Sequence, residues 1–103
     1  MDDINGYSIP EWIHLLGERF KDYRMRANMT QKDVAEKSGL TVQTISKFES
    51  GMTNNMSLVS FLLLIKSIGL VGRMDELLPE LPESPYLYRT DEKKAQRIRH
   101  KKQ

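Results

Sequence analysis

The chain has 103 residues, of which 39% are hydrophobic, and this length suits one small folded domain with extensions rather than two independent cores. It contains no cysteine, which excludes disulfides, thiol nucleophiles and cysteine-based zinc sites and is compatible with a reducing cytoplasm. Residues 1–88 carry nine Lys and Arg against twelve Asp and Glu, a net charge of −3, whereas residues 89–103 carry seven against two, a net charge of +5. This uneven distribution excludes binding of a polyanion through the bulk charge of the folded part.

No targeting or membrane segment is expected. The segment before Ser8 has no basic stretch followed by an apolar run, so it does not have the pattern of a signal peptide. The longest apolar stretch, residues 58–70, contains two serines, a lysine and a glycine and is too short to span a bilayer. These features predict a cytoplasmic protein that has no membrane partner.

A long helix is predicted over about residues 9–26. Ser8 and Glu11 have the spacing of a capping box at its start. Apolar side chains recur there at spacings of three and four, and they predict an inward stripe of Ile9, Ile13, Leu16, Phe20 and Tyr23. Trp12 lies at the edge of this stripe, where it either covers the core or joins a dimer contact. His14 has no second histidine nearby and is expected to be structural.

Two short helices joined by a tight turn are predicted between Thr30 and Gly51. Thr30 and Asp33 form a second capping box. The helix that they open is expected to end at Gly39, because glycine adopts the left-handed conformation without a steric penalty. Thr41 is the next N-cap, and the second helix follows it and ends before Gly51. This arrangement matches the helix-turn-helix pattern.

The second of these helices divides into two faces when its residues are placed about 100° apart. Ile45 and Phe48 share the inward face. The opposite face offers amide, hydroxyl, cationic and aliphatic groups, the kinds of groups that read base edges in DNA: Val42, Gln43, Ser46, Lys47 and Ser50. On the first helix, Val34 and Ala35 are expected to point inward and Gln31 outward. A plain helical hairpin needs no such polar face and is the less favoured interpretation.

Residues 52–56, MTNNM, are predicted to form a loop, in which Thr53 and Asn54 either donate to a phosphate or are ordinary solvated residues. Ser57 is expected to cap the next helix. Its predicted core face comprises Leu58, Phe61, Leu62 and Ile65, and apolar residues also cover its other sides, namely Val59, Leu63, Leu64 and Ile68. A domain this small cannot cover both faces, so we predict that the second face meets a symmetry mate in a homodimer. One more short helix is predicted over residues 70–78.

Proline recurs at every third position in residues 79–85, PELPESP, which disfavours a helix and predicts an extended linker. The predicted organisation is therefore a domain over residues 1–78, a linker over 79–88 and a basic tail over 89–103. Three large side chains in the linker either pack back on the domain or its dimer partner, or form a docking motif: Tyr86, Leu87 and Tyr88. The tail has no apolar stripe, so a helix there has nothing to bury.

Several of these residues stand at the spacings of the phage-repressor-like (Cro/CI, or XRE) helix-turn-helix family: Thr30, Gln31, Ala35, Gly39, Ile45, Glu49 and Gly51. The resemblance extends from about Leu16 to Ile68. It implies an all-α, compact bundle of about five helices of the lambda-repressor-like type, followed here by the basic tail. It also implies a repressor that binds an inverted-repeat operator in double-stranded DNA as a dimer.

The resemblance assigns roles to individual side chains. Residues that face bases in the family correspond to Val42, Gln43 and Lys47, and those that hold phosphates or brace the reading residues correspond to Gln31, Thr41 and Thr44. With the polar face and the loop included, the predicted DNA-binding residues are Gln31, Thr41, Val42, Gln43, Thr44, Ser46, Lys47, Thr53 and Asn54. The family also pairs an arginine and a glutamate at the positions of Arg24 and Glu49, which implies an ion pair here.

The layout of the whole chain resembles the HipB-like antitoxins that sit beside HipA-like kinases. The shared features are a single repressor-like domain, a proline-spaced linker and an arginine-rich tail that ends near RIRHKK. A stand-alone repressor would share everything up to Leu78. A HipA-like kinase toxin as partner and a repressor without such a partner are therefore both open at this point.

The residues that enzymes use are missing. His14 and His100 are the only histidines, and the sequence has no glycine-rich phosphate loop, paired metal ligands or serine nucleophile elbow. We therefore expect neither catalysis nor a cofactor. The rival from another class is a protein-interaction module, such as a toxin-neutralising partner, that does not bind DNA sequence-specifically.

Overall fold

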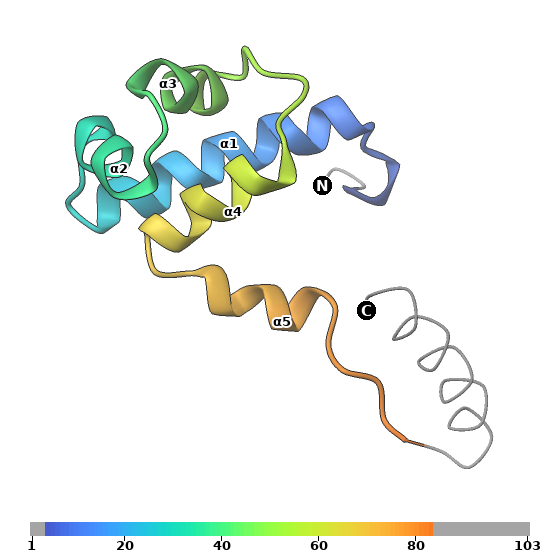
Figure 1. Cartoon of the computed structure of the whole chain (residues 1–103). Coiled ribbons are helices and arrows are strands. Elements are labelled where there is room, and N and C mark those ends of the chain that lie inside the picture. Colours follow the sequence, from blue (N-terminus) through green and yellow to red (C-terminus); the bar gives the residue numbers. More distant parts are fainter. Residues whose placement is uncertain (1–3, 84–103) are drawn as a thin grey trace, which may run out of the picture.

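The computed structural model describes residues 4–83, which form an all-α bundle without strands (Figure 1). Its α-helices are α1 (Ile9–Arg26), α2 (Gln31–Ser38), α3 (Val42–Ser50), α4 (Leu58–Ser67) and α5 (Met74–Leu77), and its short 3-10 helices are η1 (Ile4–Gly6) and η2 (Val71–Arg73). The predicted fold class and helix order are confirmed. The segment Tyr86–Tyr88 and the basic tail lie outside the described residues, so the predicted domain boundaries stay predictions.

Capping side chains set the start of α1 as expected. The backbone N–H of Ser8 donates to the Glu11 carboxylate (2.8 Å), and the Ser8 hydroxyl accepts from the Glu11 N–H (3.2 Å). The first of these bonds is the main reason that the pKa of Glu11 lies below its usual value. Asn28, beyond the helix end, has a φ of 61°, a left-handed conformation that asparagine tolerates.

The inward stripe predicted for α1 is confirmed for Ile13 and Phe20 and wrong for its other members. Ile9 and Tyr23 are 71% and 51% exposed, and Leu16 is also exposed. The residues that face the bundle are Ile13, Gly17, Phe20 and Arg24. They form a row at helical spacing in which a glycine permits close approach and an arginine is neutralised by a partner, so hydrophobicity alone did not identify the row.

The core combines side chains from α1 to α4. Its fully buried members are Phe20, Val34, Ile45, Phe48 and Leu64. The Phe48 ring lies between those of Phe20 and Phe61, with ring centroids 5.7 and 6.4 Å away, in the tilted and edge-on arrangements that aromatic pairs prefer. Met29, Ala35 and Leu40 pack against this cluster. The aromatic contacts thus join α1, α3 and α4.

The predicted core face of α4 also needs correction. Ser57 caps the helix as expected, since its hydroxyl accepts from the Ser60 N–H (3.0 Å). However, Leu58 is 70% exposed, and Leu64, which the pattern placed on the second face, is fully buried. The packed row is Phe61, Leu64, Ile65 and Ile68. This row faces inward because α4 packs against α2 through it, which leaves Leu58 and Val59 in solvent.

The short helix expected over residues 70–78 is present as η2 followed directly by α5. In Figure 1 it lies apart from α1, α2 and α3, and Leu77, Leu78 and Leu81 are all at least 70% exposed. Residues 79–83 have no regular secondary structure. Among the helices of residues 4–83, none has both the length and the apolar character needed to cross a membrane.

Candidate nucleic-acid interface

The start and the end of α2 are set by the residues that the sequence indicated. The Thr30 hydroxyl accepts from the Asp33 N–H (3.0 Å), and the Asp33 carboxylate accepts from the Thr30 N–H (2.8 Å), which is the main cause of the lowered pKa of Asp33. Gly39 ends α2 with a φ of 79°, and its N–H donates to Ala35 O (2.9 Å). The capping box thus fixes the start of α2, and Gly39 ends that helix and leaves a very short connection to α3.

The exposed face of α3 carries most of the predicted reading residues. Ile45 is fully buried, whereas Val42 is 43% exposed. The exposed positions on the helix are Val42, Gln43, Ser46, Lys47 and Ser50. The faces divide as the periodicity predicted, and α3 lies at the edge of the bundle with this row exposed to solvent (Figure 1).

The structure places the remaining predicted site residues around this row. Thr41 caps α3, accepting from the Thr44 N–H (3.1 Å), and the two hydroxyls hydrogen-bond at 2.9 Å. In the loop after α3, Asn54 is exposed and Thr53 is half-buried. Thr41 and Thr44 thus lie at the start of α3, and the loop follows directly from its end.

The sequence predicted that Gln31 points outward, and the structure confirms this only in part. Its side chain is half-buried, and its amide Nε2 donates to Glu49 Oε1 (3.1 Å). It therefore connects the first residue of α2 with the end of α3. No pattern in the sequence predicts this bond, because the two residues are eighteen positions apart.

The predicted Arg24–Glu49 pair is present and buried. Arg24 donates to both carboxylate oxygens of Glu49, from Nε to Oε2 (2.7 Å) and from Nη2 to Oε1 (2.9 Å). Its Nη1 also donates to the backbone carbonyl of Met29 (2.8 Å). The hydrogen bonds to Glu49 raise the pKa of Arg24 above its usual value. The pair fixes α3 against α1 and removes the only acidic group of α3 from solvent.

Two further contacts between α1 and α3 are not predictable from the apolar pattern. A Cβ on Gly17 would lie 2.0 Å from the Phe48 carbonyl oxygen, so the two backbones pass closer than any larger residue permits. The side chain of His14 hydrogen-bonds through Nε2 to the carbonyl of Gly51, which ends α3. In the sequence, the only signal of a close contact here is Gly17, a glycine within an otherwise regular helix. Together with Arg24, these residues hold the C-terminal end of α3 against α1.

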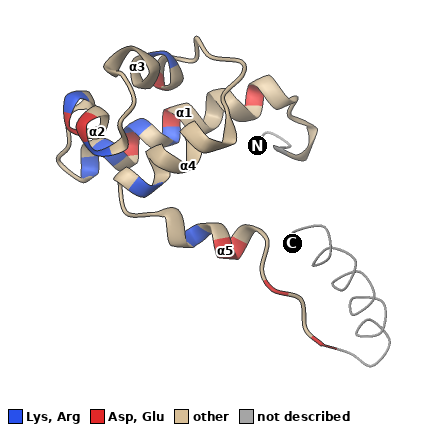
Figure 2. Ribbon diagram, viewed as in Figure 1, with Lys and Arg blue, Asp and Glu red and all other residues tan. Residues whose placement is uncertain are grey.

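The charges on the exposed face favour an anionic partner. Lys47 is the only charged side chain of α3 that faces solvent, since Glu49 is paired with Arg24. Figure 2 shows other cationic residues on α1 and α2, interspersed with acidic ones. The face therefore presents local positive charge and hydrogen-bonding groups, while the described part of the chain has no broad basic surface. No cluster of metal-binding side chains occurs within residues 4–83.

The five-helix bundle, its tight turn and the exposed second helix define a helix-turn-helix domain. Residues 20–69, just under half of the chain, match the family model described as Helix-turn-helix. This match supports the Cro/CI-like (XRE) family and a DNA-binding regulator of that type, and it covers nearly the same residues as the resemblance seen in the sequence. No curated protein matches the chain.

Proposed function

We propose that this protein is a sequence-specific regulator of transcription, a repressor, that inserts α3 into the major groove of double-stranded DNA. The observation that carries the proposal is the exposed row on α3 together with the burial of Glu49 behind it. An acidic group at the surface of α3 would repel phosphates, and here the only one is neutralised by Arg24.

The side chains of the row differ in what they recognise. Gln43 has the amide donor and acceptor that bind N6 and N7 of adenine, and the methyl groups of Val42 suit the thymine methyl. Lys47 donates to guanine or to a phosphate, and Ser46 donates or accepts at a base edge. These contacts supply sequence discrimination within one half-site.

Other residues are proposed to fix the register on the backbone. Thr41 and Thr44 bring hydroxyls to the start of α3, where backbone N–H groups favour a phosphate. Thr53 and Asn54 follow α3 and are proposed to reach the next phosphates. Gln31 braces this arrangement through Glu49 and needs no direct DNA contact for that role.

The repressor is proposed to act as a C2 homodimer. Large apolar side chains that no part of residues 4–83 covers support this, including Leu58 and Val59 on α4 and Leu77 and Leu78 in and after α5. Two copies of α3 would then enter successive major grooves, and the operator would be an inverted repeat with half-site centres about one helical turn apart. Sedimentation should show a dimer at micromolar concentration, and a monomer bound to one unrepeated site would contradict the dimer.

Substitution of Gln43 tests base reading. Gln43→Ala should weaken operator binding by about 1–3 kcal/mol, roughly 5- to 150-fold, and relax preference at one position of each half-site. Glu18→Ala, an exposed change on α1 outside the proposed site, is the matched control and should leave binding unchanged. If the Gln43→Ala protein selects the same DNA motif as the wild type, Gln43 does not read a base.

A second candidate function is that of an antitoxin paired with a HipA-like kinase toxin, either in addition to DNA binding or as a protein-interaction module without it. The proline-spaced linker and basic tail of the sequence favour it. A kinase-like gene beside this one, whose purified product forms a stable complex with the full chain, would support the pairing. No complex between the two purified proteins would favour the stand-alone repressor.

A further inference from the structure

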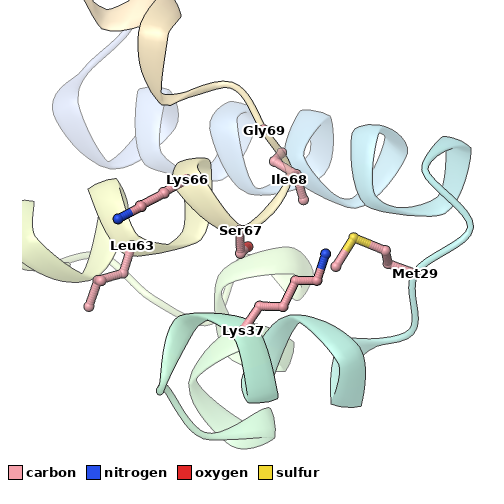
Figure 3. A pocket seen from close by; sticks show the side chains of 7 residues that line it. All are labelled: Met29, Lys37, Leu63, Lys66, Ser67, Ile68 and Gly69. Carbon is pink, nitrogen blue, oxygen red and sulfur yellow. The ribbon is translucent and has the colours of Figure 1, made fainter.

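A shallow pocket of about 570 Å³ lies between α2 and the end of α4 (Figure 3). We call it the lysine pocket, and its lining residues are Met29, Lys37, Leu63, Lys66, Ser67, Ile68 and Gly69. Figure 3 shows Lys37 reaching from α2 toward Met29, with Lys66 on the α4 side beside Leu63. The pocket therefore combines apolar walls with two cations and has no acidic lining residue.

Neither lysine of this pocket forms an ion pair within residues 4–83, where the ion pairs are Arg24–Glu49 and Arg73–Glu76. Lys37 and Lys66 are both exposed to solvent. Apolar walls flanked by cations suit a ligand that brings apolar groups and carboxylates together.

The same chain contains a segment with these groups. We call residues 74–83 the acidic arm. It carries three leucines that are 70–82% exposed, namely Leu77, Leu78 and Leu81, and four acidic residues, namely Asp75, Glu76, Glu80 and Glu83. Figure 2 marks the acidic residues in red along α5 and the segment that follows it. Of these acidic groups, Glu76 is paired with Arg73 (2.6 Å), an exposed contact of small energetic value.

The arm does not fill the pocket of its own chain. The chain turns after Gly69, which is itself a lining residue, and after η2 the arm begins with α5, which in Figure 1 runs away from that end of α4. Its leucines consequently stay in solvent. The chain thus has a cationic apolar pocket and an anionic apolar segment that are complementary and do not meet.

We propose that the acidic arm of each copy docks into the lysine pocket of a second copy. This inference rests on the homodimer of the proposed function and specifies one of its contacts. The exchange is reciprocal, so two arms fill two pockets and the assembly closes with C2 symmetry. It leaves α3 uncovered, because α3 and α5 lie on opposite sides of the bundle in Figure 1.

A charge exchange between two full-length variants tests this contact. The pocket variant carries Lys37→Glu and Lys66→Glu, and the arm variant carries Glu80→Lys and Glu83→Lys, all at exposed positions. Each variant alone should have a dimer Kd raised about tenfold or more, because four proposed ion pairs become like-charge contacts. Mixed together, the two variants should form a heterodimer of nearly wild-type affinity, since one docked contact keeps its original charges and the other has both charges reversed.

The control for this exchange is a variant with Arg19→Glu and Lys21→Glu, which reverses two exposed charges outside the pocket and should keep the wild-type Kd. Sedimentation equilibrium gives the Kd, native mass spectrometry identifies the heterodimer, and far-UV circular dichroism checks the fold. Dimerisation of both reversed variants at wild-type affinity, or failure of the mixture to form a heterodimer, would overturn the proposal.

Apolar substitutions separate arm exchange from the proposed function as a whole. Leu78→Ser with Leu81→Ser should weaken the dimer at any salt concentration, because it removes apolar contact and no charge. Leu58→Ser with Val59→Ser reports instead on the exposed first turn of α4. A dimer abolished only in this second variant would refute arm exchange and leave the dimeric regulator intact, whereas a monomeric wild type would contradict both.

Discussion

The close approach of α1 and α3 makes Gly17→Ala an informative substitution. In an open helix this change stabilises by about 0.5–1 kcal/mol. Here the new Cβ would lie 2.0 Å from the Phe48 carbonyl oxygen, and ordinary contact begins near 3.4 Å. The obstacle is backbone, so α1 and α3 must move apart and loosen the contact between the Phe20 and Phe48 rings.

The expected fall in stability follows from these two opposing effects. Overpacking costs about 1–3 kcal/mol, and a clash with backbone belongs at the upper end. After the gain in helix propensity, Gly17→Ala should lower the free energy of unfolding by about 2 kcal/mol, equivalent to a fall of roughly 8–16 °C in Tm for a domain of this size. Urea and thermal unfolding measure the effect, and operator affinity should fall with it because α3 is displaced.

Gly72→Ala is the matched control. An added Cβ there meets nothing within 4 Å, and the position has no left-handed φ. It should leave stability unchanged or raise it slightly. The reasoning is refuted if Gly17→Ala is as stable as the Gly72→Ala control.

Glu49→Ala should destabilise the domain by about 3 kcal/mol and weaken DNA binding; the value is at the low end for a broken buried pair because Arg24 keeps its bond to the Met29 carbonyl. The control Glu49→Gln keeps the shape of the side chain and should destabilise less. Equal denaturation midpoints for the wild type and Glu49→Ala would contradict this prediction. The stability contributed by the Glu11 and Asp33 carboxylates should be fully present above about pH 4.5 and be lost as the pH falls through their lowered folded-state pKa values, because the unfolded chain then binds more protons. Asp33→Asn should flatten this pH dependence of the unfolding free energy in acid titrations. An unchanged profile would exclude Asp33 as a contributor. Removal of residues 89–103 should reduce the affinity for all DNA alike without altering the preferred motif. It should also flatten the slope of log affinity against log salt concentration by about 0.9 for each phosphate that the tail neutralises. An unaltered slope would indicate a tail that binds a partner protein.

The caps and the turn were predictable because they depend on local spacing. Ser8, Thr30 and Thr41 bond within three residues of themselves, and Gly39 takes the left-handed conformation that glycine adopts without a steric penalty. The division of α3 into two faces was also predictable, since its inner positions are plainly apolar. The sequence could therefore indicate which side chains of α3 face solvent.

The inward faces of α1 and α4 were only partly predicted, and the reason is physical. Hydrophobic periodicity does not recognise Gly17, which is valuable for its lack of a side chain, or count Arg24, whose charge is neutralised by Glu49. On α4 every side is apolar, so the pattern could not choose Leu64 over Leu58. The bonds of His14 to Gly51 and of Gln31 to Glu49 join distant parts of the chain and exist only once the helices have packed.

Selection of binding sites from random double-stranded DNA, with the full-length protein, tests the central claim most directly. If the exposed face of α3 reads bases in a dimer, the selected pool should converge on one inverted repeat with half-site centres about one helical turn apart. The Gln43→Ala protein should relax one position in each half of that repeat. Binding without enrichment of any motif, or no binding at all, would contradict a sequence-specific regulator and favour a protein-interaction module.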